Sequence, residues 1–216
     1  MKKVLSVLIV ALFQLSIATH VGGNVNPAYI HNPAQRVSDW QISLRYLEEG
    51  NKRYLEGRTQ ERNNVEDRVI LKDGQNPFVV ILTCSDSRVS PEIYFDQKLG
   101  DIFVIRNAGN IADVTALGSL EYAVEHLRVP LVVVVGHSAC GAVNGALSEG
   151  EFSVNLQTII NAIRPAVKEH DNLNDAIRMN IAHNVDLIRA NETVMQAGAV
   201  VMGAYYNIET GGIIFY

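Results

Sequence analysis

The sequence contains only two cysteines and one tryptophan among its 216 residues. Two cysteines are too few for a disulfide-stapled scaffold, and a chain of this length has enough core not to need one. Basic residues are also in the minority, because 18 Lys and Arg stand against 23 Asp and Glu and the formal net charge is −5. This balance argues against a nucleic-acid surface, which normally needs a basic face. The sequence contains no Gly-x-Gly-x-x-Gly or P-loop pattern, so nothing favours nucleotide binding.

Apolar residues make up 48% of the chain, which excludes a disordered protein, but one of their runs is set apart from the rest. Residues 1–18 begin with Lys2 and Lys3, continue as a short apolar stretch, and end with the small residues Ser16 and Ala18. The stretch is short for a membrane span of about 20 residues. It is typical of a secretory signal peptide cleaved after Ala18, which predicts an exported, periplasmic protein. An uncleaved interfacial or membrane anchor is the alternative.

The remainder predicts an arm followed by one domain. Residues 19–37, which include His20 and His31, lack periodicity, and we expect a leader or an arm lying on a neighbour. Residues 38–216 alternate apolar runs typical of strands with amphipathic helical patterns. This alternation indicates an α/β fold with a mainly parallel central sheet flanked by helices and an N-terminal helical arm. We expect strands at 78–82, 102–105, 131–135 and 199–204, and an edge strand at 213–215.

Three local features refine the expected helices. Ser38 and Gln41 have the spacing of a capping box at the start of the first helix. Asn174 is placed to cap a later helix. Pro165 should kink or shorten the helix that contains it, because proline lacks the N–H that the helix needs.

Both cysteines lie in loops that directly follow expected strands. Cys84 follows the strand at 78–82, and His137 and Cys140 follow the strand at 131–135. If these strands are neighbours, the three side chains converge at the carboxyl edge of the sheet, where α/β proteins form their sites. Two thiolates and one imidazole suit zinc and leave its fourth position open for water. A Cys84–Cys140 disulfide or redox pair, and inert buried cysteines, are the alternatives.

Asp86 and Arg88 follow Cys84 at alternate positions. A surface ion pair is the simplest interpretation of these two residues. An arginine beside an aspartate also favours the charged carboxylate and orients it by bidentate hydrogen bonds. Such a carboxylate could accept a proton from a zinc-bound hydroxide and direct its lone pair to a substrate. It could instead occupy the open zinc position and shut the site down.

Two short segments carry a family resemblance. Residues 84–88 (Cys-Ser-Asp-Ser-Arg) and 137–141 (His-Ser-Ala-Cys-Gly) are similar to the two signature segments of beta-class carbonic anhydrases. The similarity continues through 101–110, 118–124 and 203–206 and covers roughly residues 40–216. It implies a lyase that reversibly hydrates carbon dioxide to bicarbonate and a proton through a zinc-bound hydroxide. It also implies a homodimer or homotetramer.

The resemblance assigns roles to individual residues. It implies one Zn²⁺ per subunit, held by Cys84, His137 and Cys140, and a catalytic dyad of Asp86 and Arg88. It further implies substrate-binding positions, with part of the pocket wall contributed by a second subunit; these positions are Gln75, Phe103, Tyr122 and Gly141.

One position distinguishes two branches of the family. One branch carries a tryptophan three residues before the first cysteine, which helps to hold bicarbonate in an allosteric pocket. This chain has Ile81 there, so we expect the branch with an open, water-bearing zinc. Three other functions are alternatives: a carbon disulfide or carbonyl sulfide hydrolase on the same fold, a non-catalytic zinc-stabilised interaction protein, and a thiol redox protein.

Overall fold

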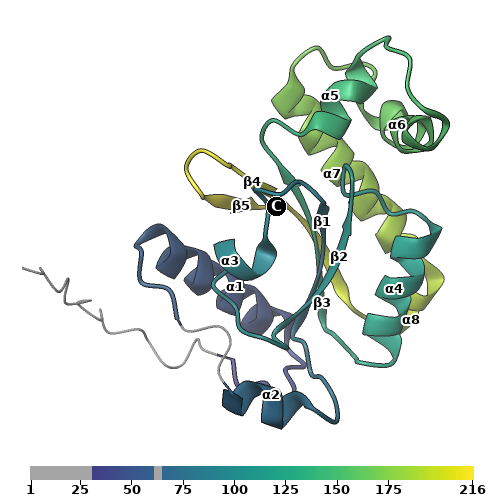
Figure 1. The fold of residues 1–216 in the computed structure, drawn as a ribbon. Coiled ribbons are helices and arrows are strands. Elements are labelled where there is room, and N and C mark those ends of the chain that lie inside the picture. Colours follow the sequence, from purple (N-terminus) through teal and green to yellow (C-terminus); the bar gives the residue numbers. More distant parts are fainter. Residues whose placement is uncertain (1–30, 61–64) are drawn as a thin grey trace, which may run out of the picture.

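A computed structural model describes residues 31–60 and 65–216 (Figure 1). Its centre is a five-stranded sheet with the order β2-β1-β3-β4-β5. The first four strands pair in parallel, and β5 pairs antiparallel with β4. The mainly parallel sheet predicted from the sequence is therefore confirmed. The strands are β1 (Val79–Cys84), β2 (Ile102–Asn107), β3 (Leu131–His137), β4 (Val200–Tyr206) and β5 (Ile213–Phe215).

Helices cover both faces of this sheet. Figure 1 shows α1 and α3 on one face, and α4 with α5 to α8 on the other. The helices are α1 (Trp40–Leu55), α2 (Val65–Leu71), α3 (Pro91–Tyr94), α4 (Val114–Glu125), α5 (Gly141–Leu147), α6 (Val154–Val167), α7 (Leu173–Arg189) and α8 (Glu192–Ala197). No helix in the described part of the chain is both long and apolar enough to cross a membrane. The expected signal peptide at 1–18 lies outside the described residues.

Strands β1 and β3 are buried along their whole length, as their uninterrupted apolar sequences predict. Successive side chains of a strand point to opposite faces, so β1 contributes to two cores. Val80, Leu82 and Cys84 belong to the core that the helices α4 to α8 cover. Val79 and Ile81 belong to the core beneath α1 and α3. This alternation places the Cys84 sulfur on the face of the larger helical layer.

The helix ends correct two of the local expectations. The N-cap of α1 is Asp39, whose side chain accepts a hydrogen bond from the Gln41 amide, so the expected capping box at Ser38 is wrong by one residue. The N-cap of α7 is Asn172, and Asn174 lies inside the first turn. In both cases a neighbouring short polar side chain has the extended backbone that a cap requires. Helix α6 continues through Pro165 and ends two residues later, at Val167, the last residue of its apolar pattern.

The end of the expected arm packs firmly onto the domain. His31 is only 3% exposed, and its Nδ1 lies 2.8 Å from Oδ1 of Asp101, just before β2. Its Nε2 donates to the carbonyl of Gln35 at 3.0 Å. The ring also contacts Tyr46 and Phe78, with centroids 5.7 and 5.1 Å away. His31 therefore ties this segment to the amino ends of β1 and β2, a role that the irregular sequence around it does not indicate.

Candidate metal centre

Cys84, His137 and Cys140 converge at the carboxyl edge of the sheet. Strands β1 and β3 are parallel neighbours, and Cys84 and His137 are their last residues. Cys140 follows three residues after His137 as the N-cap of α5. Between them Ala139 adopts a left-handed backbone with φ 56°, which reverses the chain tightly. The three ligand atoms all lie within 4.8 Å of one another, so the convergence predicted from the sequence is confirmed.

The ring of His137 is prepared to bind a metal. Its Nδ1 lies 2.9 Å from the carbonyl oxygen of Ser138, which can only accept, so Nδ1 carries the proton. In the neutral ring Nε2 is then the acceptor, and it is buried without a hydrogen-bond partner among the described residues. A buried nitrogen lone pair facing two sulfur atoms fits a cation that prefers N and S ligands, such as zinc. The Nδ1 contact fixes the tautomer, as outer partners of metal-binding histidines do.

Both thiols are free and buried, and each changes the acidity of the other. The hydrogen bond from Cys140 lowers the pKa of Cys84 far below its ordinary value, and the same contact raises the pKa of Cys140. A cation that binds both sulfur atoms requires both thiols to give up their protons. The amide of Gly109 also donates to the Cys84 sulfur at 3.4 Å. The two cysteines, which the sequence could also have placed in a disulfide, are both free in this structure.

Asp86 and Arg88 form a bidentate ion pair beside the thiols. Arg88 donates from Nε to Oδ1 at 2.9 Å and from Nη2 to Oδ2 at 2.7 Å, and its backbone amide also donates to Oδ1. These bonds hold the pKa of the Asp86 carboxyl well below its usual range. The carboxylate therefore stays ionised and keeps one orientation. Both residues predicted as a dyad are brought together as expected.

Arg106 is a site residue that the sequence reasoning missed. It lies near the end of β2, and its Nε donates to the carbonyl of Cys84 at 3.1 Å. Its Nη2 donates to the carbonyl of Asp86 at 2.8 Å. One guanidinium therefore holds the backbone on both sides of Ser85. The sequence signal for it was its place in the segment 101–110, which carries part of the family resemblance; that the next residue, Asn107, pairs with Cys84 only the structure shows.

Three of the four predicted substrate-binding residues are not brought to this cluster within one chain. Phe103 pairs with Val80, four residues before Cys84, which is about 13 Å along the strand. Tyr122 on α4 lies beside Phe103, with ring centroids 6.3 Å apart. Gln75 is exposed and precedes the amino end of β1.

Gly141 differs from the other three, because it is the first residue of α5 and directly follows Cys140. A Cβ added there would meet no atom within 4 Å, so this position opens onto free space next to the cluster.

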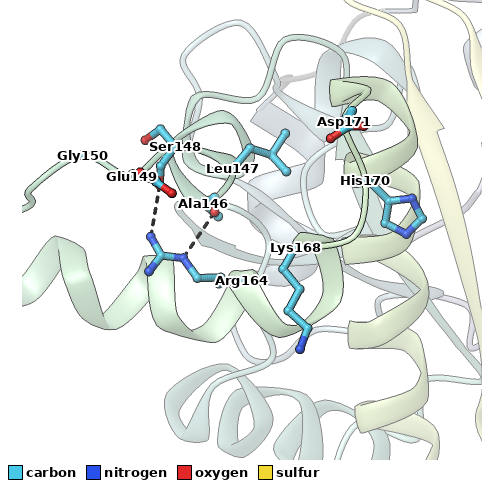
Figure 2. Close-up of a pocket in the computed structure, with 9 residues that line it drawn as sticks. All are labelled: Ala146, Leu147, Ser148, Glu149, Gly150, Arg164, Lys168, His170 and Asp171. Carbon is cyan, nitrogen blue, oxygen red and sulfur yellow. Dashed lines mark hydrogen bonds between the residues drawn. The ribbon is translucent and has the colours of Figure 1, made fainter.

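Two cavities help to delimit the site. A cavity of about 570 Å³ is lined by Arg88 of the dyad and by Ser138 and Ala139, the two residues between His137 and Cys140, together with residues at the start of α7 and around the end of β4. A second, of about 540 Å³, lies at the far end of α5 (Figure 2). There Arg164 points to the carbonyls of Ala146 and Ser148, and Lys168 extends away from them. Because its side chains do not converge, this second cavity is not a candidate reaction site.

These features define a class of protein: a parallel α/β domain with a candidate mononuclear metal centre and an ion-paired carboxylate at the carboxyl edge of its sheet. The carbonic anhydrase family model matches residues 79–213, which include both cysteines, His137 and the dyad. The chain belongs to the beta-class carbonic anhydrase family.

Individual relatives agree with this assignment. Carbonic anhydrase 2 of Mycobacterium tuberculosis is 55% identical over 103 residues, which are 47% of this chain and 50% of that protein. The chain thus spans about half the length of this relative. A carbonic anhydrase of Synechocystis sp. is 30% identical over 80% of this chain and 71% of its own length. Among solved structures, a tetrameric beta-carbonic anhydrase from Sordaria macrospora superposes with a TM-score of 0.66 at 27% identity, over 82% of this chain and 94% of its own.

Proposed function

We propose that this chain catalyses the reversible hydration of carbon dioxide to bicarbonate and a proton, with one zinc ion held by Cys84, His137 and Cys140. The observation that carries the proposal is the buried Nε2 of His137, which has no hydrogen-bond partner among the described residues and lies within 4.8 Å of two free thiols. When bound, zinc lowers the pKa of a coordinated water enough to supply a nucleophile near neutral pH. Membership of the carbonic anhydrase family supports this reaction over the other zinc-dependent alternatives.

We assign to Asp86 the role of accepting the hydrogen bond from the O–H group of the nucleophile. Its carboxylate is ionised and can only accept a hydrogen bond, so it orients an O–H group with the oxygen lone pair turned away from itself. Arg88 donates one hydrogen bond to each oxygen of the Asp86 carboxylate and so prevents the carboxylate from rotating. Arg106 fixes the backbone of the same loop through the carbonyls of Cys84 and Asp86.

The surroundings of Ile81 support a centre without the allosteric bicarbonate pocket that one branch of the family has. Ile81 is fully buried and belongs to an apolar cluster with Tyr94 and Phe95. A polar anion placed there would have to displace packed apolar side chains. Asp86 is meanwhile engaged by Arg88 rather than released toward the metal ligands. We therefore propose that the fourth metal position stays open.

The three predicted substrate-binding residues Gln75, Phe103 and Tyr122, which we call the substrate wall, lead us to propose a homodimer or a higher oligomer. Gln75, Phe103 and Tyr122 lie far from their own metal cluster, so they can serve a reaction site only across a subunit interface. Strand β2 is an edge strand, with β1 as its one neighbour in the described sheet, and its apolar side chains are partly exposed, unlike those of β1. An apolar sheet edge is a template for association with another chain. A tetrameric relative in the same family is consistent with this arrangement.

We also propose that residues 1–18 direct export, because they combine a basic start, an apolar stretch and small residues at the end. Bicarbonate is charged and crosses membranes poorly, so an exported enzyme would govern interconversion outside the inner membrane. Cell fractionation of the full chain and of a chain lacking residues 1–18 tests this. Equal distribution of the two between compartments would contradict it.

The decisive experiment measures carbon dioxide hydration by protein lacking residues 1–18, after its zinc has been quantified. We expect one zinc per chain and activity that falls with zinc when a chelator is added. A zinc-loaded protein without hydration activity would refute the proposed reaction. A metal-free protein with active thiols would instead favour a redox function.

A further inference from the structure

Two buried asparagines lie one turn apart on α7, outside the residues used above. Asn180 is 1% exposed and Asn184 is 2% exposed, and a buried amide is costly unless its polar atoms are hydrogen-bonded. Asn180 Nδ2 donates to the carbonyl of Gly109 at 2.9 Å, and Asn184 Oδ1 accepts from the amide of Ala112 at 2.7 Å. Asn184 Nδ2 donates back to the Asn180 carbonyl at 2.7 Å. The pair thus holds both ends of the segment 109–112.

The segment 109–112 has a conformation that needs such support. Gly109 and Asn110 both adopt left-handed backbones, with φ of 78° and 46°, and the second is unfavourable for a residue with a Cβ. Gly109 also packs closely against α6, because a Cβ added there would lie 2.5 Å from Cδ1 of Ile163. The backbone is therefore confined from two sides, by α6 and by the asparagines of α7.

This confined backbone points one amide at the metal cluster. The Gly109 N–H donates to Sγ of Cys84 at 3.4 Å. A hydrogen bond to a thiolate disperses part of its negative charge and restricts where the sulfur can lie. Partners of metal ligands tune affinity in this way, and their loss typically costs about 10–100-fold in metal binding.

We propose that Asn180 and Asn184 are positioning residues for Cys84. They hold the 109–112 segment so that the Gly109 amide stays on the sulfur, and through it they set the affinity of the metal centre and the electron donation of this thiolate. The inference rests on the proposed zinc function and deepens it. It connects α7, which contributes no ligand, to the metal centre through one backbone amide.

The alternative is a purely structural pair that stabilises the loop and leaves the metal unaffected. Two variants of the full chain separate these readings. Asn180→Asp keeps the volume and the acceptor but removes the donor to Gly109, and Asn180→Leu removes both. Asn161→Asp is the matched control, because Asn161 is exposed on α6 and bonds only Gln157 among the described residues.

Zinc affinity is measured by competition with a chromophoric chelator, and the thiolate-to-metal absorption band is recorded with cobalt in place of zinc. We expect both Asn180 variants to bind zinc about 10–100-fold more weakly and to shift the cobalt band. The control should match the wild type in both measurements. Wild-type zinc affinity and an unshifted band in folded Asn180 variants would overturn the inference. Failure of the wild-type protein to bind zinc would instead refute the proposed function.

Two further measurements apply if the Asn180 variants do not fold. Asn184→Asp keeps the acceptor for Ala112 and removes only the donor to Asn180, and we expect weaker zinc binding there too. In wild-type protein loaded with NMR-active cadmium, we expect scalar coupling between the metal and the Gly109 amide hydrogen across the sulfur. Absence of this coupling would overturn the inference without any substitution.

Discussion

The guanidinium of Arg88 binds the carboxylate of Asp86 through two parallel hydrogen bonds, of 2.9 and 2.7 Å, within a single turn after β1. Residues two apart in a loop form such a pair only if the backbone between them is constrained. Here the amide of Arg88 also donates to Oδ1 of Asp86, and Arg106 holds the Asp86 carbonyl. The orientation of this carboxylate is therefore built into the loop.

Replacing Asp86 should separate catalysis from metal binding. We expect Asp86→Asn to retain zinc, because the proposed ligand set does not include Asp86, but to lose at least about 100-fold in kcat, the usual contribution of a group that handles a proton. Steady-state hydration kinetics and zinc content check this. Asp73→Asn is the control, since Asp73 is a highly exposed carboxylate near α2. Full activity in Asp86→Asn would show that the dyad assignment is wrong.

Arg106 offers a test of loop positioning. Lysine cannot reproduce the fork of a guanidinium, so Arg106→Lys should lose at least one of the bonds to the carbonyls of Cys84 and Asp86. We expect roughly a tenfold loss in kcat/KM, or about 1.4 kcal/mol, with zinc still bound. Unchanged kinetics would mean that the loop keeps its shape without Arg106.

The three ligands should act together. Cys84→Ser or His137→Ala should lose zinc and activity in parallel, by more than the roughly 100-fold that a lost partner of a ligand costs. Removing zinc from the wild type with a chelator should also make both thiols accessible to a thiol reagent. His126→Ala is a suitable control, because His126 is 62% exposed on its side chain and lies at the end of α4. Stoichiometric zinc in His137→Ala would contradict the ligand set.

The contact between His31 and Asp101 should dominate the stability of the described N-terminal segment. Both side chains are 1% exposed, and removing one partner of a buried pair typically costs about 3–5 kcal/mol. We expect His31→Ala to lower the free energy of unfolding by this amount, measured by urea titration. The double variant His31→Ala/Asp101→Asn should recover part of the loss. Full additivity of the two substitutions would show that the pair is not coupled.

The same pair predicts a pH dependence. Burial raises the pKa of Asp101, and the hydrogen bond from His31 lowers it. In His31→Ala the lowering effect of His31 is lost, while burial and the smaller lowering effect of Lys98 remain, so the pKa of Asp101 in the folded state rises further above its unfolded value. The stability of this variant should be highest below the ordinary carboxyl pKa of about 4 and fall as pH rises through the raised value. Urea midpoints across that range check this; a slope equal to that of the wild type would contradict it.

The parallel sheet and the convergence of Cys84, His137 and Cys140 were predictable because their signals are local. Buried strands such as β1 and β3 are continuous apolar runs, and Cys84 and His137 end those runs. The supports of the site were not predictable. Asn180 lies 71 residues from the Gly109 carbonyl that it binds. His31 lies 70 residues from Asp101 within a segment that has no periodicity. Such contacts depend on how elements meet in space, which composition and spacing do not encode.

The proposed placement of the substrate wall can be tested by mixing two inactive chains. Gln75 lies before β1, at the opposite end of the strand from Cys84, so any contribution to a reaction site must come from the partner subunit. A chain with Asp86→Ala keeps Gln75, and a chain with Gln75→Ala keeps the dyad. In a mixed dimer one site combines the intact dyad of the second chain with the intact wall of the first.

Denaturing and refolding the two chains together should therefore restore activity that neither possesses alone. Random mixing makes half of the dimers mixed, and each holds one intact site, so recovery should approach a quarter of the wild-type activity. Asp86→Ala mixed with Asp86→Asn is the control and should recover nothing, because both chains lack the carboxylate. If the wall served its own chain, every site in the first mixture would keep one defect. Mixed dimers that remain as inactive as the parent chains would then refute the shared site.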